Sequence, residues 1–89
     1  MNQAIQFPDQ EEWDAEKRAV FFPATSNGFQ ICCAIYIDEL KRMAEDPVNH
    51  DPLTLFRSLR WDLEDLAEQK ILNEDYNDDG WIWISGCER

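Results

Sequence analysis

The chain has 89 residues, enough for one small domain, and we take residues 1–89 as that single domain. Its 19 acidic and 8 basic residues give a net charge of −11. A hydrophobic content of 44% with 12% aromatic residues excludes a disordered acidic tail. Because phosphate groups are bound by clustered Lys and Arg, we expect no nucleic acid and no membrane among the partners.

Two further features indicate where the protein works. No apolar run approaches the ~20 residues of a transmembrane helix, and the first residues lack the basic and apolar regions of a signal peptide. The three cysteines are an odd number without the spacing of a disulfide framework. We therefore expect a cytoplasmic protein.

The first elements in chain order have weak signals. Residues 4–8 alternate between apolar and polar side chains up to Pro8, which is typical of a short edge strand. Residues 9–18 are charged, with Trp13 as their only large apolar side chain. We interpret them as a loop or a single helical turn.

A β-hairpin follows and has the strongest local signal. Two β-type runs, residues 19–24 and 29–36, flank Asn27-Gly28, a pair that favours a type I′ turn because both residues tolerate a positive φ. A two-residue turn here pairs, on one face of the hairpin, Ala24 with Ile31, Phe22 with Cys33 and Val20 with Ile35. The opposite face carries Ala19, Phe21, Pro23, Cys32, Ala34 and Tyr36. Both faces are therefore largely apolar.

Two helices are predicted after the hairpin. Residues 37–45 have acidic side chains in the first turn and basic ones near the end, which matches the helix dipole. After a linker over residues 46–50, Asp51 is an N-cap followed by Pro52, and a helix is predicted to run to about Asn73. Its apolar stripe consists of Leu55, Phe56, Leu59, Leu63, Leu66, Ala67 and Ile71.

An acidic turn over residues 75–80 and an alternating strand over residues 81–85 complete the pattern. The element order is β-β-β-α-α-β. This order predicts an α+β fold: a single small domain with an antiparallel three- to four-stranded sheet and two helices on one face.

Three stretches of the sequence carry a resemblance to a known family. The hairpin contains Val20-x-Phe22-x-Ala24 and Gly28-x-x-Ile31-x-Cys33-x-Ile35, Leu40 follows, and the long helix contains Phe56-x-x-x-Arg60-x-x-Leu63-Glu64-x-x-Ala67-x-x-Lys70. In their order and spacing, these stretches resemble the small bacterial proteins of the domain of unknown function 1488. The resemblance implies a compact α+β domain of the bacterial cytoplasm, and it implies no activity.

The acidic turn contains a weak metal-site candidate. Asp75, Asn77, Asp79 and Gly80 match the opening of a calcium-binding loop. The twelfth position of such a loop needs a bidentate carboxylate and is Gly86 here, so a turn without metal is favoured. A zinc site would have to use Cys32, Cys33, Cys87 and His50, which lack zinc-ligand spacing. We therefore predict no metal and no other cofactor.

The sequence contains no recognisable catalytic residues. The glycine-rich phosphate-binding motifs and the serine nucleophile motif are all missing, and pairs of carboxylates arise by chance among 19 acids. Arg60, beside Phe56 at the edge of the helical stripe, has two interpretations. It contacts an anion or a partner's carboxylate, or it pairs with Glu64 one turn later, which is favoured. We interpret the chain as non-catalytic.

The last strand carries the candidate interaction surface. If Ile82 and Ile84 join the helix-covered core, Trp81 and Trp83 join the hairpin residues Phe21, Cys32 and Tyr36 on the second sheet face. An aromatic-rich second face suggests an interface. Two alternatives stay open: the N-terminal segment covers this face through Phe7 and Trp13, or the strand is turned so that its tryptophans enter the core.

These observations predict an acidic, non-catalytic protein-interaction module. Its interaction surface is Phe21, Tyr36, Trp81 and Trp83, and its partner is another protein or a second copy in a homodimer. The alternative is a small-molecule or metal-ion binding domain that uses the Asp75–Asp79 turn or the Trp81/Trp83 face.

Overall fold

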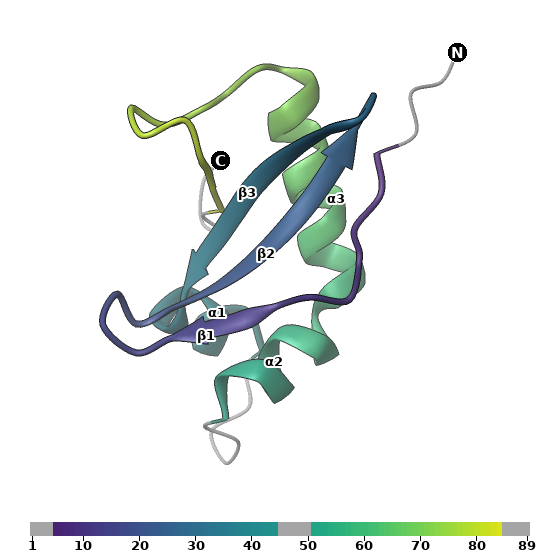
Figure 1. The fold of residues 1–89 in the computed structure, drawn as a ribbon. Helices are drawn as coiled ribbons and strands as arrows, with labels where there is room; N and C mark the ends of the chain where they lie inside the picture. Colours follow the sequence, from purple (N-terminus) through teal and green to yellow (C-terminus); the bar gives the residue numbers. More distant parts are fainter. Residues whose placement is uncertain (1–4, 45–50, 85–89) are drawn as a thin grey trace.

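The computed structural model describes residues 5–44 and 51–84. Within them, the elements are β1 (Glu12–Asp14), β2 (Ala19–Ser26), β3 (Phe29–Tyr36), α1 (Ile37–Ala44), α2 (Pro52–Ser58), α3 (Arg60–Leu72) and β4 (Ile82–Trp83). The strands form one sheet in the order β1-β2-β3-β4 (Figure 1). The predicted α+β class is confirmed.

The β2–β3 hairpin has the predicted turn and register. Asn27 and Gly28 both have a positive φ, of 54° and 83°. Phe22 pairs with Cys33, and the neighbouring pairs follow in the same register along all eight residues of each strand. The turn chemistry therefore determines which side chains lie on each face.

The strand before this hairpin was placed wrongly. β1 lies within residues 9–18, which were expected to be a loop or a helical turn, and it pairs antiparallel with β2. Residues 4–8 contribute an isolated bridge between Gln6 and Thr25 instead of a strand, although residue 4 lies outside the described residues. The Asp14 carboxylate stabilises the turn between β1 and β2, because it accepts hydrogen bonds from the backbone N–H groups of Glu16 and Lys17. These hydrogen bonds stabilise a tight turn of four residues, after which the chain runs back along β1 as β2.

The predicted long helix is two helices, so the described residues contain three helices instead of two. Asp51 caps α2 as expected, accepting the backbone N–H of Thr54 at 3.0 Å. The break is at Leu59, whose φ of −108° and ψ of 13° are not helical. The Ser58 hydroxyl donates to the Leu55 carbonyl at 2.8 Å. A serine that bonds back to the preceding turn bends a helix, and the bend separates α2 from α3.

The final strand is parallel to its neighbour, whereas an antiparallel sheet was expected. β4 pairs with β3 through Cys33–Ile82 and Ala34–Trp83. Three helices connect the two strands, and a long helical crossover is the usual link between parallel strands. β4 covers two of the predicted residues 81–85, of which residue 85 lies outside the described residues, and the Ile84 N–H also donates to the Ala34 carbonyl. The sheet is therefore mainly antiparallel with one parallel edge.

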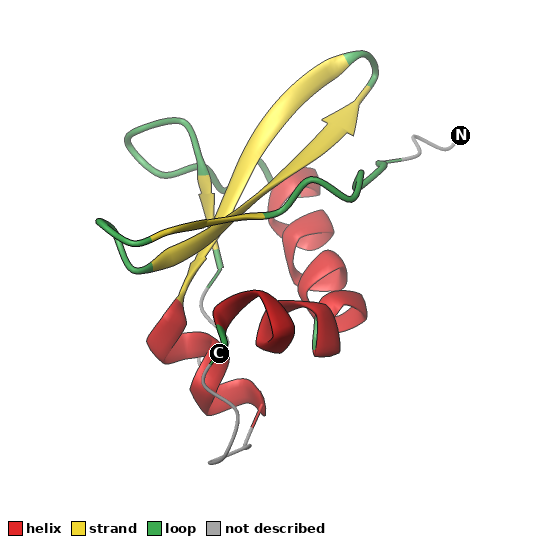
Figure 2. Ribbon diagram, turned by 60° about the horizontal axis from the view of Figure 1, so that its bottom comes forward, coloured by secondary structure: helices red, strands yellow, loops and turns green. Residues whose placement is uncertain are grey.

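The hydrophobic core lies between one face of the sheet and the helices, which gather on that side (Figure 2). Leu63 and Ala67 of the predicted stripe are fully buried, while Leu59 and Leu66 are partly buried against the same core. Ile82 and Ile84 are buried in it too. None of the described helices combines the length and apolar character needed to cross a bilayer.

Candidate interaction surface

The second face of the sheet carries four aromatic side chains in mutual contact. We call Phe21, Tyr36, Trp81 and Trp83 the aromatic surface. Trp83 is central: its ring lies 4.7 Å from Tyr36 in a stacked arrangement, 6.3 Å from Trp81 and 6.2 Å from Phe21, between ring centroids. Phe21 and Trp81 meet edge to face at 4.8 Å. The side chains that the sequence suggested for this surface are therefore brought together from three strands and the residue before β4.

Strand alternation explains why these rings share one face. Ile82 is fully buried in the core, so the adjacent tryptophans point the other way. Ala34 is the pairing partner of both Phe21 and Trp83, and Ala19 that of Tyr36. Both alanines are fully buried although no described helix lies on this side. The small side chains thus form a floor on which the aromatic rings lie.

Both alternatives for this face are wrong. Phe7 packs on the core face, with its ring 6.4 Å from that of Phe22. Trp13 pairs with Val20 and is partly buried against the same core. The burial of Ile82 excludes the reversed strand. The N-terminal segment therefore does not cover the aromatic surface through Phe7 or Trp13.

Asp79 positions the tryptophans. Its carboxylate accepts hydrogen bonds from the Trp81 backbone N–H, at 2.9 Å, and from the Trp83 indole N–H, at 3.1 Å. These two hydrogen bonds, with a smaller contribution from the charge of Lys17, lower the pKa of the Asp79 carboxyl below its usual value. A negative charge on Asp79 thus stabilises both the turn and the orientation of Trp83.

Polar groups of the acidic turn, residues 75–80, bind other groups of the same chain. Asp75 forms an ion pair with Lys70 at 3.3 Å, and the Gly80 N–H donates to the Asn77 carbonyl. Among residues 5–44 and 51–84, no three His, Cys, Asp or Glu side chains are grouped as metal ligands. His50 and Cys87 lie outside the described residues.

Cys33 is not placed for nucleophilic chemistry. Burial, reinforced by the adjacent Cys32, raises the pKa of the Cys33 thiol to about 12. The neutral thiol packs in the core as a small apolar side chain. Cys32 is a half-buried free thiol on the opposite face.

Arg60 fastens the N-terminal segment to α3. It forms the predicted pair with Glu64 at 2.8 Å and further ion pairs with Glu11 at 3.0 Å and Asp9 at 2.8 Å. It also donates to the carbonyls of Phe7 and Pro8. The contacts to residues 7–11 were missed, because no local spacing links segments so far apart in sequence. Since these contacts engage Nε and both terminal nitrogens, the guanidinium has a structural role.

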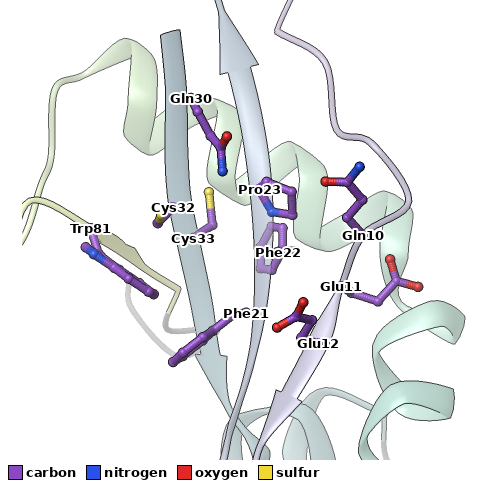
Figure 3. A pocket seen from close by; sticks show the side chains of 10 residues that line it. All are labelled: Gln10, Glu11, Glu12, Phe21, Phe22, Pro23, Gln30, Cys32, Cys33 and Trp81. Carbon is purple, nitrogen blue, oxygen red and sulfur yellow. The ribbon is translucent and has the colours of Figure 1, made fainter.

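A shallow hollow of about 430 Å³ lies beside the aromatic surface (Figure 3). Its lining residues are Gln10, Glu11, Glu12, Phe21, Phe22, Pro23, Gln30, Cys32, Cys33 and Trp81. Trp81 and Phe21 stand on one side of the view, and the Glu12 carboxylate lies close to Phe21. Two carboxylates and no basic residue line the hollow, so its chemistry suits a cation.

Comparisons with known proteins identify the family of the chain. The sequence profile described as "Protein of unknown function (DUF1488)" matches residues 5–84. The chain is similar to the "Uncharacterized protein YrdB" of Escherichia coli (strain K12), with 48% identity over 94% of this chain and 99% of that protein. It is similar to the protein of the same name from Shigella flexneri, with 46% identity over the same shares.

A solved structure supports the same assignment. The crystal structure of a protein of unknown function from the DUF1488 family of Shewanella loihica PV-4 superposes with a TM-score of 0.88. The two proteins are 34% identical, and the match covers 96% of each chain. By profile, sequence identity and fold together, this chain belongs to the DUF1488 family.

Proposed function

We propose that this protein is a non-catalytic protein-interaction module that self-associates through the aromatic surface. The observation that supports the proposal is the cluster of four rings on a sheet face over which no described helix packs. Tyr36, which stacks on the central Trp83, is 50% exposed. Tyrosine and tryptophan are favoured interface anchors, because a large apolar ring is combined with a polar atom.

The charges around the surface are compatible with pairing of two copies. Each chain carries a net charge of −11, so two copies repel one another at low salt. One carboxylate beside the rings, that of Asp79, already accepts hydrogen bonds from Trp81 and Trp83. We therefore expect salt to strengthen association by screening the overall repulsion.

The test is the mass in solution, measured by light scattering and sedimentation equilibrium at about 100 μM protein and about 0.3 M salt, where charge is largely screened. We expect a dimer of the wild type and a monomer of Tyr36→Glu, which puts a carboxylate on the aromatic surface beside Trp83. Trp61→Ala is the matched control, because Trp61 is 83% exposed on α3, outside the aromatic surface. Circular dichroism checks that each variant is folded. A monomeric wild type would refute the proposal.

We also propose that the protein works in the cytoplasm. Cys32 and Cys33 are free thiols, which a reducing compartment preserves. Fractionation of cells that express a tagged chain would test this placement.

The hollow supports a second candidate function, the binding of a small molecule. Its volume of about 430 Å³ is within the usual range for ligand sites. A panel of small organic amines, screened by thermal shift, tests it. A stabilising compound should lose its effect in Cys32→Trp, because the larger ring fills the hollow.

A further inference from the structure

Two charged side chains without an ion pair lie at opposite ends of the aromatic surface. Glu12 lines the hollow and pairs with Phe21 in the β1–β2 register. Lys17, in the turn after β1, lines a second depression with Tyr36, Asn77, Asp79 and Trp83. Within residues 5–44 and 51–84, neither Glu12 nor Lys17 forms an ion pair through its side chain. One sheet face thus carries the Glu12 carboxylate at one end and the Lys17 ammonium group, near the hydrogen-bonded Asp79, at the other.

This arrangement is self-complementary. At about 3.3 Å per residue along a strand, Glu12 and the turn that bears Lys17 are on the order of 10 Å apart. A two-fold axis parallel to the face, lying between the two copies and perpendicular to the line from Glu12 to Lys17, packs the two faces together and brings each end of one copy onto the opposite end of the other. The aromatic rings of both copies then meet at the axis.

We infer that the homodimer is isologous and that Lys17 of each copy enters the hollow of its partner beside Glu12. The inference rests on the proposed function and names the contact that sets how the two copies are oriented in the dimer. Trp81 and Phe21 beside the carboxylate add favourable contacts for an ammonium group, because the faces of aromatic rings attract cations. The two symmetric contacts place opposite charges where two strongly acidic chains would otherwise repel.

The charges of the described residues favour a second copy over an unrelated basic partner. The site offers one carboxylate without an ion pair, Glu12, because Glu11 in the same lining is bound by Arg57 and Arg60. It therefore suits a single basic side chain rather than a basic tract. Lys17 is such a side chain, and it borders the same rings.

Charge-reversal variants distinguish the effect of the Glu12–Lys17 contact on dimerisation from the effect of the net charge. Glu12→Lys changes the net charge from −11 to −9, so overall repulsion alone would strengthen dimerisation. The pairing of Glu12 with the partner's Lys17 instead makes this variant dimerise about tenfold more weakly, because two lysines then face one another at both contacts. Lys17→Glu should also weaken the dimer. The double variant exchanges the charges, keeps the net charge of −11 and should regain the wild-type dissociation constant.

The matched control is Glu68→Lys, which gives the same net charge of −9 from an exposed position on α3. Sedimentation equilibrium of all the variants should show weakening only in the two single reversals at the face. If Glu12→Lys dimerises as well as Glu68→Lys while Tyr36→Glu is monomeric, the pairing is wrong and the proposed function stands. A monomeric wild type overturns both. A monomer that binds a lysine peptide through Glu12 assigns the hollow to another protein and also overturns the inference.

Discussion

Arg60 allows a sharp test of how the N-terminal segment is attached, because this one side chain binds the segment at four residues, from Phe7 to Glu11. Its side chain is 19% exposed and contacts Glu11, Glu64, Asp9 and two backbone carbonyls. It also lies over the Phe56 ring, 5.7 Å from the centroid. We expect Arg60→Ala to destabilise the whole domain rather than only to loosen its N-terminal segment.

The magnitude follows from the burial of the partners. Asp9 has an 88% exposed side chain, so its pair contributes about 0–1 kcal/mol. Glu11 is 7% exposed and loses one of its two arginine partners, and a hydrogen bond to a charged group contributes about 1.5–3 kcal/mol. Together with the lost carbonyl contacts, we expect a loss of about 2–4 kcal/mol. For a domain of this size the melting temperature should fall by roughly 10–25 °C.

Urea denaturation followed by tryptophan fluorescence measures this loss. Arg57→Ala is the matched control, because Arg57 binds the same Glu11 carboxylate through a side chain that is 58% exposed. The control should lose less stability than Arg60→Ala, because Arg57 makes only one of these contacts and its side chain is more exposed. Equal losses in the two variants, or a loss below about 1 kcal/mol in Arg60→Ala, would show that Arg60 does not anchor the segment.

Four further predictions follow from the same structure. Gly28→Val should cost about 1–3 kcal/mol in thermal unfolding, since its φ of 83° strains any β-branched residue although nothing lies within 4 Å of an added Cβ. Leu63→Ala should cost about 2–5 kcal/mol because the side chain is fully buried, and an unchanged denaturation midpoint would contradict that burial. Burial raises the pKa of Glu11, but the hydrogen bonds from Arg57 and Arg60 outweigh it and hold the pKa below the ordinary 4.5. Glu11 therefore stabilises the fold above pH 4.5 and loses this effect as the pH falls through its lower folded-state pKa, so Glu11→Gln should lose less stability on acidification than the wild type. Calorimetry should detect no calcium site tighter than about millimolar at the 75–80 turn, and a micromolar site abolished by Asp75→Ala would contradict this.

The elements that sequence predicts well are those specified by neighbouring residues. Asn27-Gly28 defines its own turn, and the turn then determines the register of both strands. Asp51 caps its helix through a residue three positions away. The alternation of β4 assigns its isoleucines to the core and its tryptophans to the other face. Each of these signals operates within a few residues.

The elements that were missed depend on distant or competing contacts. The helical stripe continues smoothly through Leu59, and the bend depends on which hydrogen bond the Ser58 hydroxyl makes. β1 forms because β2 offers an open edge, and its own sequence is charged. The ion pair between Arg60 and Glu11 likewise joins two segments that no periodic pattern in the sequence connects. Lys17 was not recognised because its position beside Tyr36 and Trp83 exists only in the folded chain.

The parallel pairing of β4 with β3 affects the timing of assembly during synthesis. β3 is made early, but the two tryptophans that complete the ring cluster follow three helices later in the chain. A chain still emerging from the ribosome therefore presents Phe21 and Tyr36 without the rings that stack on them, over Ala19 and Ala34 that are still uncovered. The aromatic surface is therefore complete only after Trp83, the last of its four rings in the chain, has been made.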